Sequence, residues 1–264
     1  EGQMSLRPAV GTELWVDQGG RDTGPTLLPM HGLSGTGRIW DGLRPLLEKH
    51  WPGRWIIPDM RGHGRSSHSD RYGIACHASD MADLVSDVKE LYLAGHSMGG
   101  LVGILMASGW FGVMPKAVVT SGVKVDWTEE ERAGLFKLID MPVKWFDSED
   151  DARERFILVT GLKGVADPAS EFAGTGVVEE KGKWRLAADN RAAMVADADT
   201  RDIYAAARAP VVLASGEHDR MVSVAELRTL DAEAQELPGL GHNAHVEDPA
   251  AFWSLILSAM EIGS

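Results

Sequence analysis

One serine in this 264-residue chain stands in a setting that is typical of a catalytic nucleophile. The run Gly95-His-Ser-Met-Gly-Gly100 follows the apolar stretch Glu90–Ala94 and precedes a second apolar stretch, Leu101–Ala107. This pattern predicts a strand, a very tight turn and a buried helix, with Ser97 at the tip of the turn. Glycines fit at the flanking positions because the strand and helix backbones nearly touch there. The helix begins at the serine, so its free N–H groups point where a negative charge would form during nucleophilic attack.

The C-terminal third of the chain supplies the two partners that a serine nucleophile needs. A serine hydroxyl needs a base within hydrogen-bond reach, and the base needs a carboxylate that fixes its tautomer. Asp219 follows a buried strand predicted at Pro210–Ala214, and His242 lies in a glycine-flanked loop before the last predicted helix. We therefore predict a triad in which Ser97 is the nucleophile, His242 is the base and Asp219 is the acid.

Three neighbouring residues enter as alternatives. His245 lies three residues beyond His242 and could serve as the base, although the glycine directly before His242 favours the latter. Asp126 follows another predicted strand and could serve as the acid instead of Asp219. His96 is adjacent to the serine, but successive side chains of a strand point to opposite faces. We therefore expect His96 to be a packed or hydrogen-bonded histidine.

The elements that must position these residues follow from the apolar pattern. Short continuous apolar runs fit the buried strands of a parallel sheet that is covered on both faces. The predicted strands span residues 26–30, 55–57, 91–94, 117–119, 210–214 and 234–237, preceded by an alternating edge strand at 12–17. Helices are predicted between them at 40–49, 78–88, 101–110, 224–229 and 249–260. This alternation predicts an α/β fold with a doubly wound sheet, in which ligands bind at the carboxyl ends of the strands.

The segment from residue 124 to residue 198 breaks the alternation. It contains predicted helices at 128–139 and 149–160, a middle rich in Gly, Ala and Asp, and scattered large aromatic residues. Because it lies between two predicted sheet strands, we predict a helical cap inserted into a core made of residues 1–123 and 199–264. The aromatic residues of the cap are expected to serve mainly in packing.

Composition and charge argue against several classes of function. The formal net charge of −13 at pH 7 opposes binding to nucleic acid or to an anionic membrane. No apolar run approaches the roughly 20 residues that cross a bilayer, and the first residues do not form a signal peptide. The single cysteine, Cys76, suits a reducing cytoplasm. We expect a cytoplasmic monomer or homodimer that acts on a small molecule, with no nucleic-acid or membrane partner.

Two further features are interpreted as structural. The run Pro58–Ser66 is typical of a turn whose aspartate and arginine side chains fix loops by charge-assisted hydrogen bonds. His63, His68 and His77 lack the short paired spacings of zinc ligands, which favours surface histidines over a metal site. No metal and no cofactor are expected.

Taken in order, these motifs resemble those of the α/β-hydrolase superfamily, in the branch of capped serine esterases and lactonases. The resemblance covers nearly the whole chain outside the cap, and it is carried by residues 30–33, 58–66, 95–100, 216–219 and 241–249. It implies the α/β-hydrolase fold, with a mostly parallel eight-stranded doubly wound sheet and an inserted helical cap. It also favours Asp219 as the acid and implies that the backbone N–H groups of Leu33 and Met98 form the oxyanion hole. Such a pair of donors would hold the charge of a tetrahedral intermediate.

The nucleophile narrows the expected reaction. Epoxide hydrolases and haloalkane dehalogenases resemble this chain but attack with aspartate, whereas Ser97 stands at that position here. The run His31–Gly37 lacks the proline that proline iminopeptidases and carbon–carbon bond hydrolases carry. We therefore expect a small or medium carboxylic ester or lactone to be hydrolysed by water through an acyl-enzyme.

Three alternatives stay open at this point. They are a carbon–carbon bond hydrolase, a cofactor-free haloperoxidase or perhydrolase on the same triad, and a ligand-binding receptor on the same fold. The net negative charge weakly opposes an anionic substrate, unless a local arginine such as Arg38 overrides it.

Overall fold

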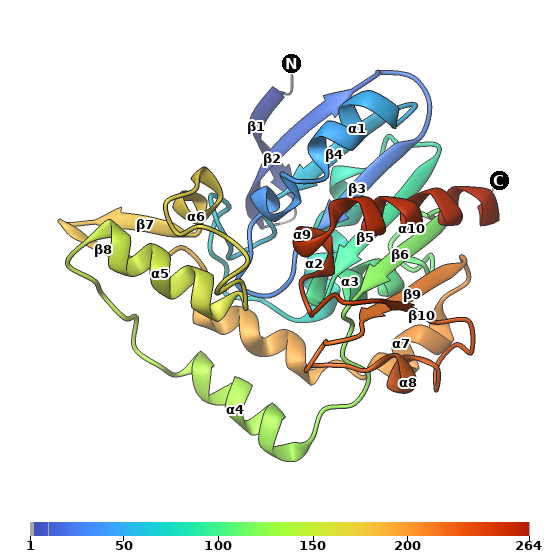
Figure 1. Ribbon diagram of the computed structural model, residues 1–264. Helices are drawn as coiled ribbons and strands as arrows, with labels where there is room; N and C mark the ends of the chain where they lie inside the picture. The colour runs from blue at the N-terminus through green and yellow to red at the C-terminus, as the bar shows by residue number, and fades with distance from the viewer. Residues whose placement is uncertain (1–2, 10, 264) are drawn as a thin grey trace.

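The computed structural model describes residues 3–9 and 11–263, and its centre is an eight-stranded sheet (Figure 1). The strand order is β1-β2-β4-β3-β5-β6-β9-β10. β1 and β2 run antiparallel to their neighbours, and the remaining strands are parallel to one another. The sheet is therefore mostly parallel, as predicted. Its strands are β1 (Gln3–Ala9), β2 (Thr12–Gly20), β3 (Thr26–Met30), β4 (Arg54–Pro58), β5 (Leu91–His96), β6 (Ala117–Ser121), β9 (Val211–Gly216) and β10 (Gln235–Leu237).

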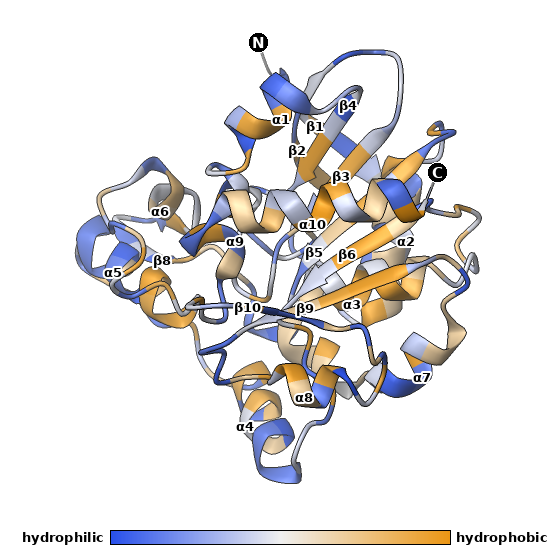
Figure 2. Ribbon diagram, turned by 45° about the vertical axis from the view of Figure 1, so that its right-hand side comes forward, coloured by the Kyte–Doolittle hydropathy of each residue, from blue (hydrophilic) through white to orange (hydrophobic). Residues whose placement is uncertain are grey.

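Helices cover both faces of this sheet, with α1 and α10 on one face and α2 and α3 on the other (Figure 1). Along β5, Leu91 and Leu93 belong to the core that includes α2 and α3, whereas Tyr92 and Ala94 belong to the core that includes α1 and α10. Burial on both faces explains why such strands are continuous apolar runs. Figure 2 shows this apolar centre and the hydrophilic outer helices such as α5. The helices outside residues 124–198 are η1 (Gly37–Trp40), α1 (Arg44–His50), α2 (Ile74–Leu84), α3 (Met98–Met106), α7 (Thr200–Ala206), α8 (Val224–Leu227), α9 (Ala244–Glu247) and α10 (Pro249–Ile262).

The segment 124–198, here called the cap segment, connects β6 to β9. Besides helices it contains an antiparallel hairpin that the sequence analysis did not predict, turned at Lys181 and Gly182. Both turn residues have positive φ, of 54° and 78°, as a two-residue hairpin turn requires. Its elements are α4 (Glu129–Ile139), α5 (Glu149–Val159), α6 (Glu171–Thr175), β7 (Val177–Glu180), β8 (Lys183–Leu186) and η2 (Asn190–Asp197). The division into a core and a cap domain stays a prediction.

Two predicted elements differ from the structure. The strand expected at the sheet edge, 12–17, is the second strand, because β1 pairs along its outer side. The helix expected at 40–49 is divided, since η1 ends at Trp40 and α1 begins at Arg44, with a proline in its first turn.

No helix in the described part of the chain combines the length and the apolar character that crossing a membrane requires.

Candidate active site

Ser97 lies between the last residue of β5 and the first residue of α3, with φ +50° and ψ −115°. Such a strained backbone conformation persists only where neighbouring contacts hold it in place. A Cβ on Gly95 would collide with the backbone of Gly99, and a Cβ on Gly99 would collide with the carbonyl oxygen of Met30. The N–H of Ser97 also donates to the carbonyl oxygen of Ser121, at 2.9 Å. The two flanking glycines are therefore required by the close approach that the sequence predicted.

The predicted base and acid are in direct contact. The Nδ1 of His242 donates to Oδ2 of Asp219 at 2.9 Å, and the carboxylate is completely buried. The other carboxylate oxygen accepts from the backbone N–H groups of Met221, at 2.7 Å, and Val222, at 3.2 Å. Asp219 is thus held by its own loop and fixes the proton of the imidazole on Nδ1, which leaves Nε2 free to accept one.

Ser97 and His242 line the same pocket, although within the described residues no hydrogen bond joins the hydroxyl to the imidazole. Such bonds are often long before a substrate binds. Gly122, with φ +72°, packs against the base: a Cβ there would lie 2.9 Å from Cε1 of His242 and 3.4 Å from Oδ2 of Asp219. Sequence analysis missed Gly122, whose only signal is its place directly after β6.

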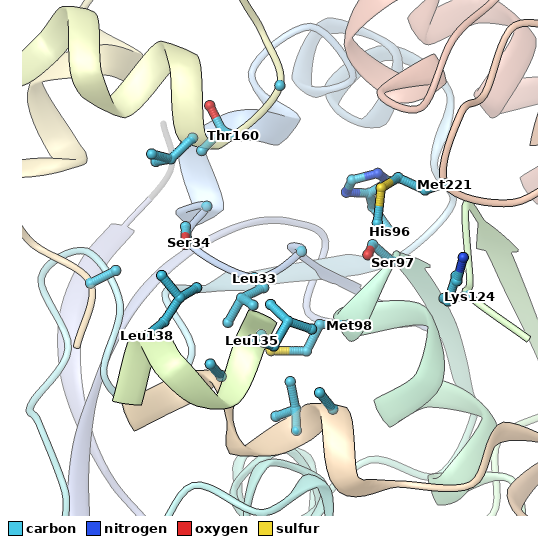
Figure 3. Close-up of a pocket in the computed structure, with 18 of the residues that line it drawn as sticks. Leu33, Ser34, His96, Ser97, Met98, Lys124, Leu135, Leu138, Thr160 and Met221 are labelled. Atoms are coloured by element: carbon cyan, nitrogen blue, oxygen red, sulfur yellow. The ribbon is translucent and has the colours of Figure 1, made fainter. Parts of the chain in front are cut away.

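Leu33 and Met98, whose backbone N–H groups are the predicted oxyanion-hole donors, line the same pocket as Ser97 (Figure 3). Neither amide has a hydrogen-bond partner in the part of the chain that the structure describes, and Ser97 provides no side-chain cap for α3. The loop that carries Leu33 approaches the serine closely, since a Cβ on Gly32 would lie 3.4 Å from Cβ of Ser97. Two unpartnered donors at this place suit a developing oxyanion.

His245 and Asp126, the alternative base and acid, have other surroundings and partners. His245 is buried, and its ring packs 4.5 Å from the ring of Trp40, with neither nitrogen bonded to a described residue. Burial, with the neighbouring His242, lowers the pKa of His245 to about 3. Asp126 is exposed and forms an ion pair with Arg201, at 2.9 and 2.5 Å. Neither residue contacts the other members of the predicted triad by a hydrogen bond.

His96 is buried and hydrogen-bonded, with Nε2 2.9 Å from the carbonyl oxygen of His242. It also lines the pocket next to Ser97. The expectation of a packed or hydrogen-bonded histidine is therefore confirmed, and the ring also reaches the loop of His242.

The pocket has a volume of about 700 Å³ and is lined mainly by apolar side chains. Residues inside and outside the cap segment line it, and Leu135 and Leu138 of α4 lie near Leu33 and Met98 (Figure 3). Trp127 also lines it, so at least one cap aromatic contacts the pocket, whereas Phe156 and Phe172 pack on each other at 5.2 Å. The charged residues of the lining are Lys124, Glu131, Arg155 and Asp189.

The turn after β4 has the structural role that the sequence predicted. Asp59 accepts from the backbone N–H of Gly37, at 2.7 Å, and from the guanidinium of Arg65, also at 2.7 Å. Arg61 forms a buried two-bond ion pair with Asp80 on α2. These charge-assisted bonds tie the turn to two other segments.

The histidines of this region are placed differently from the expectation. His63 and His77 are fully buried, so their predicted surface position is wrong, while His68 is partly exposed. His63 lies in the turn after β4 and His77 on α2, and the centroids of their rings are 6.3 Å apart. Burial lowers the pKa of His63 to about 3. Within the described ranges no three potential ligands gather into a metal site.

The chain is similar to known proteins over most of its length. Residues 27–255 match a family model described as the alpha/beta hydrolase family. A mouse protein named sn-1-specific diacylglycerol lipase ABHD11 is 27% identical over 258 residues, which cover 90% of this chain and 82% of that protein. A Yersinia enterocolitica protein named 2-succinyl-6-hydroxy-2,4-cyclohexadiene-1-carboxylate synthase is 24% identical, covering 92% of this chain and 89% of its own. An uncharacterized Mycobacterium tuberculosis protein is 29% identical over 170 residues, but the match spans only 46% of its length.

Solved structures share the same fold over nearly the whole chain. A crystal structure of E-2-(acetamidomethylene)succinate hydrolase superimposes with a TM-score of 0.83 at 20% identity, covering 99% of this chain and 100% of that one. A thioesterase domain from the curacin biosynthetic pathway gives a TM-score of 0.80 at 19% identity, covering 98% and 99%. At such identities the likeness concerns the fold.

Proposed function

Because this chain belongs to the alpha/beta hydrolase family, we propose that it is a serine hydrolase that cleaves a small or medium carboxylic ester or lactone through an acyl-enzyme. The observation that carries the proposal is the pocket shared by Ser97 and His242, where the imidazole already donates to Asp219. The printed name of the mouse relative, a diacylglycerol lipase, supports ester chemistry.

In the first half of the proposed reaction, Oγ of Ser97 attacks the ester carbonyl carbon while Nε2 of His242 takes the hydroxyl proton. The carbonyl oxygen becomes an oxyanion that accepts hydrogen bonds from the N–H groups of Leu33 and Met98. Asp219 stabilises the imidazolium that forms. The ester C–O bond then breaks, and His242 gives its proton to the leaving alcohol, which leaves the acyl group on Ser97.

Water completes the cycle. His242 accepts a proton from water as its oxygen attacks the acyl carbon, and the same two amides hold the second oxyanion. The bond to Oγ breaks, the proton returns to Ser97, and the free acid leaves. Every proton transfer uses one imidazole nitrogen, Nε2, because Nδ1 stays bonded to Asp219.

The pocket supports a substrate of limited size. Its volume, about 700 Å³, lies within the range of ordinary small-molecule sites, and its lining is mainly apolar. The acyl or alcohol part is therefore expected to be small or medium and largely hydrophobic.

Covalent labelling tests the proposal. A fluorophosphonate should modify one residue, Ser97, and the Ser97→Ala variant should lose both the label and the turnover of para-nitrophenyl esters. Labelling that persists in this variant would contradict the assignment of the nucleophile.

A substrate panel separates the proposal from its alternatives. Esters graded by acyl length and several lactones should be hydrolysed at rates that fall when the acyl chain exceeds the pocket. A carbon–carbon hydrolase would instead cleave only diketone-type substrates, a perhydrolase would need peroxide, and a receptor would bind ligands with no Ser97-dependent turnover.

A further inference from the structure

Four charged side chains line a pocket that is otherwise mainly apolar, and three of them are already paired. Nζ of Lys124 lies 2.9 Å from Oε1 of Glu131. Asp189 accepts from the guanidinium of Arg191, at 2.7 Å, and from a tyrosine hydroxyl, at 2.8 Å. The fourth, Arg155 on α5, has no ion pair or hydrogen bond to any residue that the structure describes. Arg155 therefore lines the pocket without a carboxylate partner among the described residues.

Another arginine on the same helix, Arg153, does have partners within the protein. Arg153 bonds to Glu149 four residues earlier, and its guanidinium also donates to the carbonyl oxygen of Ser170, at 3.0 Å. Arg38, the cation that the sequence suggested for anion binding, is likewise occupied, by Asp41 at 2.6 Å and by Glu171 at 2.9 Å. Arg155 is partly buried yet has no such role in holding the fold.

Arg155 lies on the helix whose C-terminal end contacts the loop of the predicted base. The C-terminal end of α5 is bonded to the loop of the base, since Nδ2 of Asn243 donates to the carbonyl oxygen of Thr160 at 3.1 Å. Thr160 also lines the pocket. Arg155 lies five residues before Thr160, which corresponds to about 7.5 Å along a helix axis. Ser97, Thr160 and Arg155 line the same pocket, so we expect one bound molecule to reach both Arg155 and Ser97.

We propose that Arg155 binds the carboxylate of the substrate, so that the preferred ester carries one free carboxylate a few bonds from its scissile carbonyl. This inference rests on the proposed ester-hydrolase function. A planar guanidinium accepts a carboxylate through two parallel hydrogen bonds, and apolar surroundings strengthen such bonds. With a net charge of −13 on the chain, an anionic substrate needs a local cation of this kind.

A pair of matched substrates tests the inference on the full chain. The monoester of glutaric acid with para-nitrophenol has a free carboxylate, and its methyl ester has the same glutaryl chain without the charge. We expect kcat/KM of the wild-type enzyme to be higher for the free acid. The Arg155→Gln variant should lower the ratio of the two kcat/KM values about 10- to 100-fold. A change that affects both substrates equally cancels in the ratio of the two kcat/KM values.

Two further variants serve as controls. Arg155→Lys keeps the charge but not the planar fork, so its ratio should lie between those of the wild type and Arg155→Gln. Lys163→Gln removes one positive charge from an exposed side chain that does not line the pocket, and should leave the ratio unchanged. A drop of the same size in Lys163→Gln would mean that overall charge, and not Arg155, sets the preference.

The position of the carboxylate is resolved by a second substrate pair. Carboxyphenyl acetate and its methyl-capped form place the charge on the alcohol side. An Arg155-dependent ratio in either pair supports the inference and assigns the side, whereas ratios that Arg155→Gln leaves unchanged in both pairs overturn it. If the wild type hydrolyses none of these esters and Ser97 is not labelled, the proposed function itself fails, and the two failures are thereby distinguished.

Discussion

The imidazole of His96 is hydrogen-bonded to the backbone of His242, with Nε2 2.9 Å from the carbonyl oxygen. A carbonyl oxygen only accepts, so Nε2 carries the proton. Burial, together with the neighbouring His245, holds the pKa of His96 well below its ordinary value, so the ring is neutral at pH 7. The residue before the nucleophile therefore fixes the loop that presents the base.

Removing this bond should affect kcat more than KM. In His96→Phe the ring shape is nearly kept but the donor is lost, and kcat should fall by roughly 2- to 13-fold, the worth of one ordinary hydrogen bond. His96→Gln, which retains an N–H donor, should recover part of the loss. The measurement is steady-state kinetics on a neutral para-nitrophenyl ester; an unchanged kcat in His96→Phe would show that the bond does not position His242.

The two C-terminal histidines should behave differently when each is replaced. His242→Ala should reduce kcat by at least about 10³-fold, because it removes the only acceptor of the serine proton in the proposed mechanism. His245→Ala should reduce kcat far less and should mainly lower the melting temperature, since His245 is buried against Trp40 and His96. The reverse order of the two kcat values would move the base to His245.

The two candidate acids can be compared in the same way. Asp219→Asn should lower kcat by about 10⁴-fold, the effect known for the equivalent change in the serine-protease triad, because the imidazole loses its fixed tautomer. Asp126→Asn removes an exposed ion pair with Arg201, so it should cost less than about 1 kcal/mol of stability and leave kcat nearly unchanged. Circular dichroism of both variants provides the folding control; a large kcat loss in Asp126→Asn would contradict the assignment.

Stability should fall as the pH is lowered from about 6.5 toward about 4. Burial lowers the pKa of His31 to about 4 and those of His63 and His245 to about 3. In the unfolded chain a histidine takes up its proton near pH 6.5, whereas these three stay neutral in the fold. Between these values the unfolded state binds more protons, so the free energy of unfolding drops by up to about 1.4 kcal/mol per pH unit for each.

Urea denaturation at pH 7, 6 and 5 measures this dependence. His245→Phe keeps an aromatic ring beside Trp40 and Phe252. It should make the free energy of unfolding fall less steeply with decreasing pH, because one of the three buried histidines is gone. A free energy of unfolding that stays constant between pH 7 and pH 5 would be inconsistent with three neutral buried histidines.

Most of the correct predictions from the sequence rested on short local patterns. The glycines around Ser97 indicate that two backbone segments lie too close for a side chain. In the structure, a Cβ on Gly95 or on Gly99 would collide with neighbouring backbone atoms. Continuous apolar runs report strands that are buried on both faces, and they fixed the alternation of strands and helices. β1 was missed because it is the edge strand, where Met4 and Leu6 are exposed and leave no buried run to detect.

Only the tertiary structure shows which charged side chains form ion pairs and which histidine rings are buried. Arg38 pairs with Glu171, 133 residues away, while Arg155 lines the pocket. His63 and His77 are buried, although nothing in their spacing indicates it. The sequence by itself determined the chemistry that is available and the order of its parts, because motifs and apolar periods act over a few residues. Pairing and burial depend on how distant elements pack, since desolvation and hydrogen bonding are set by neighbours that are remote along the chain.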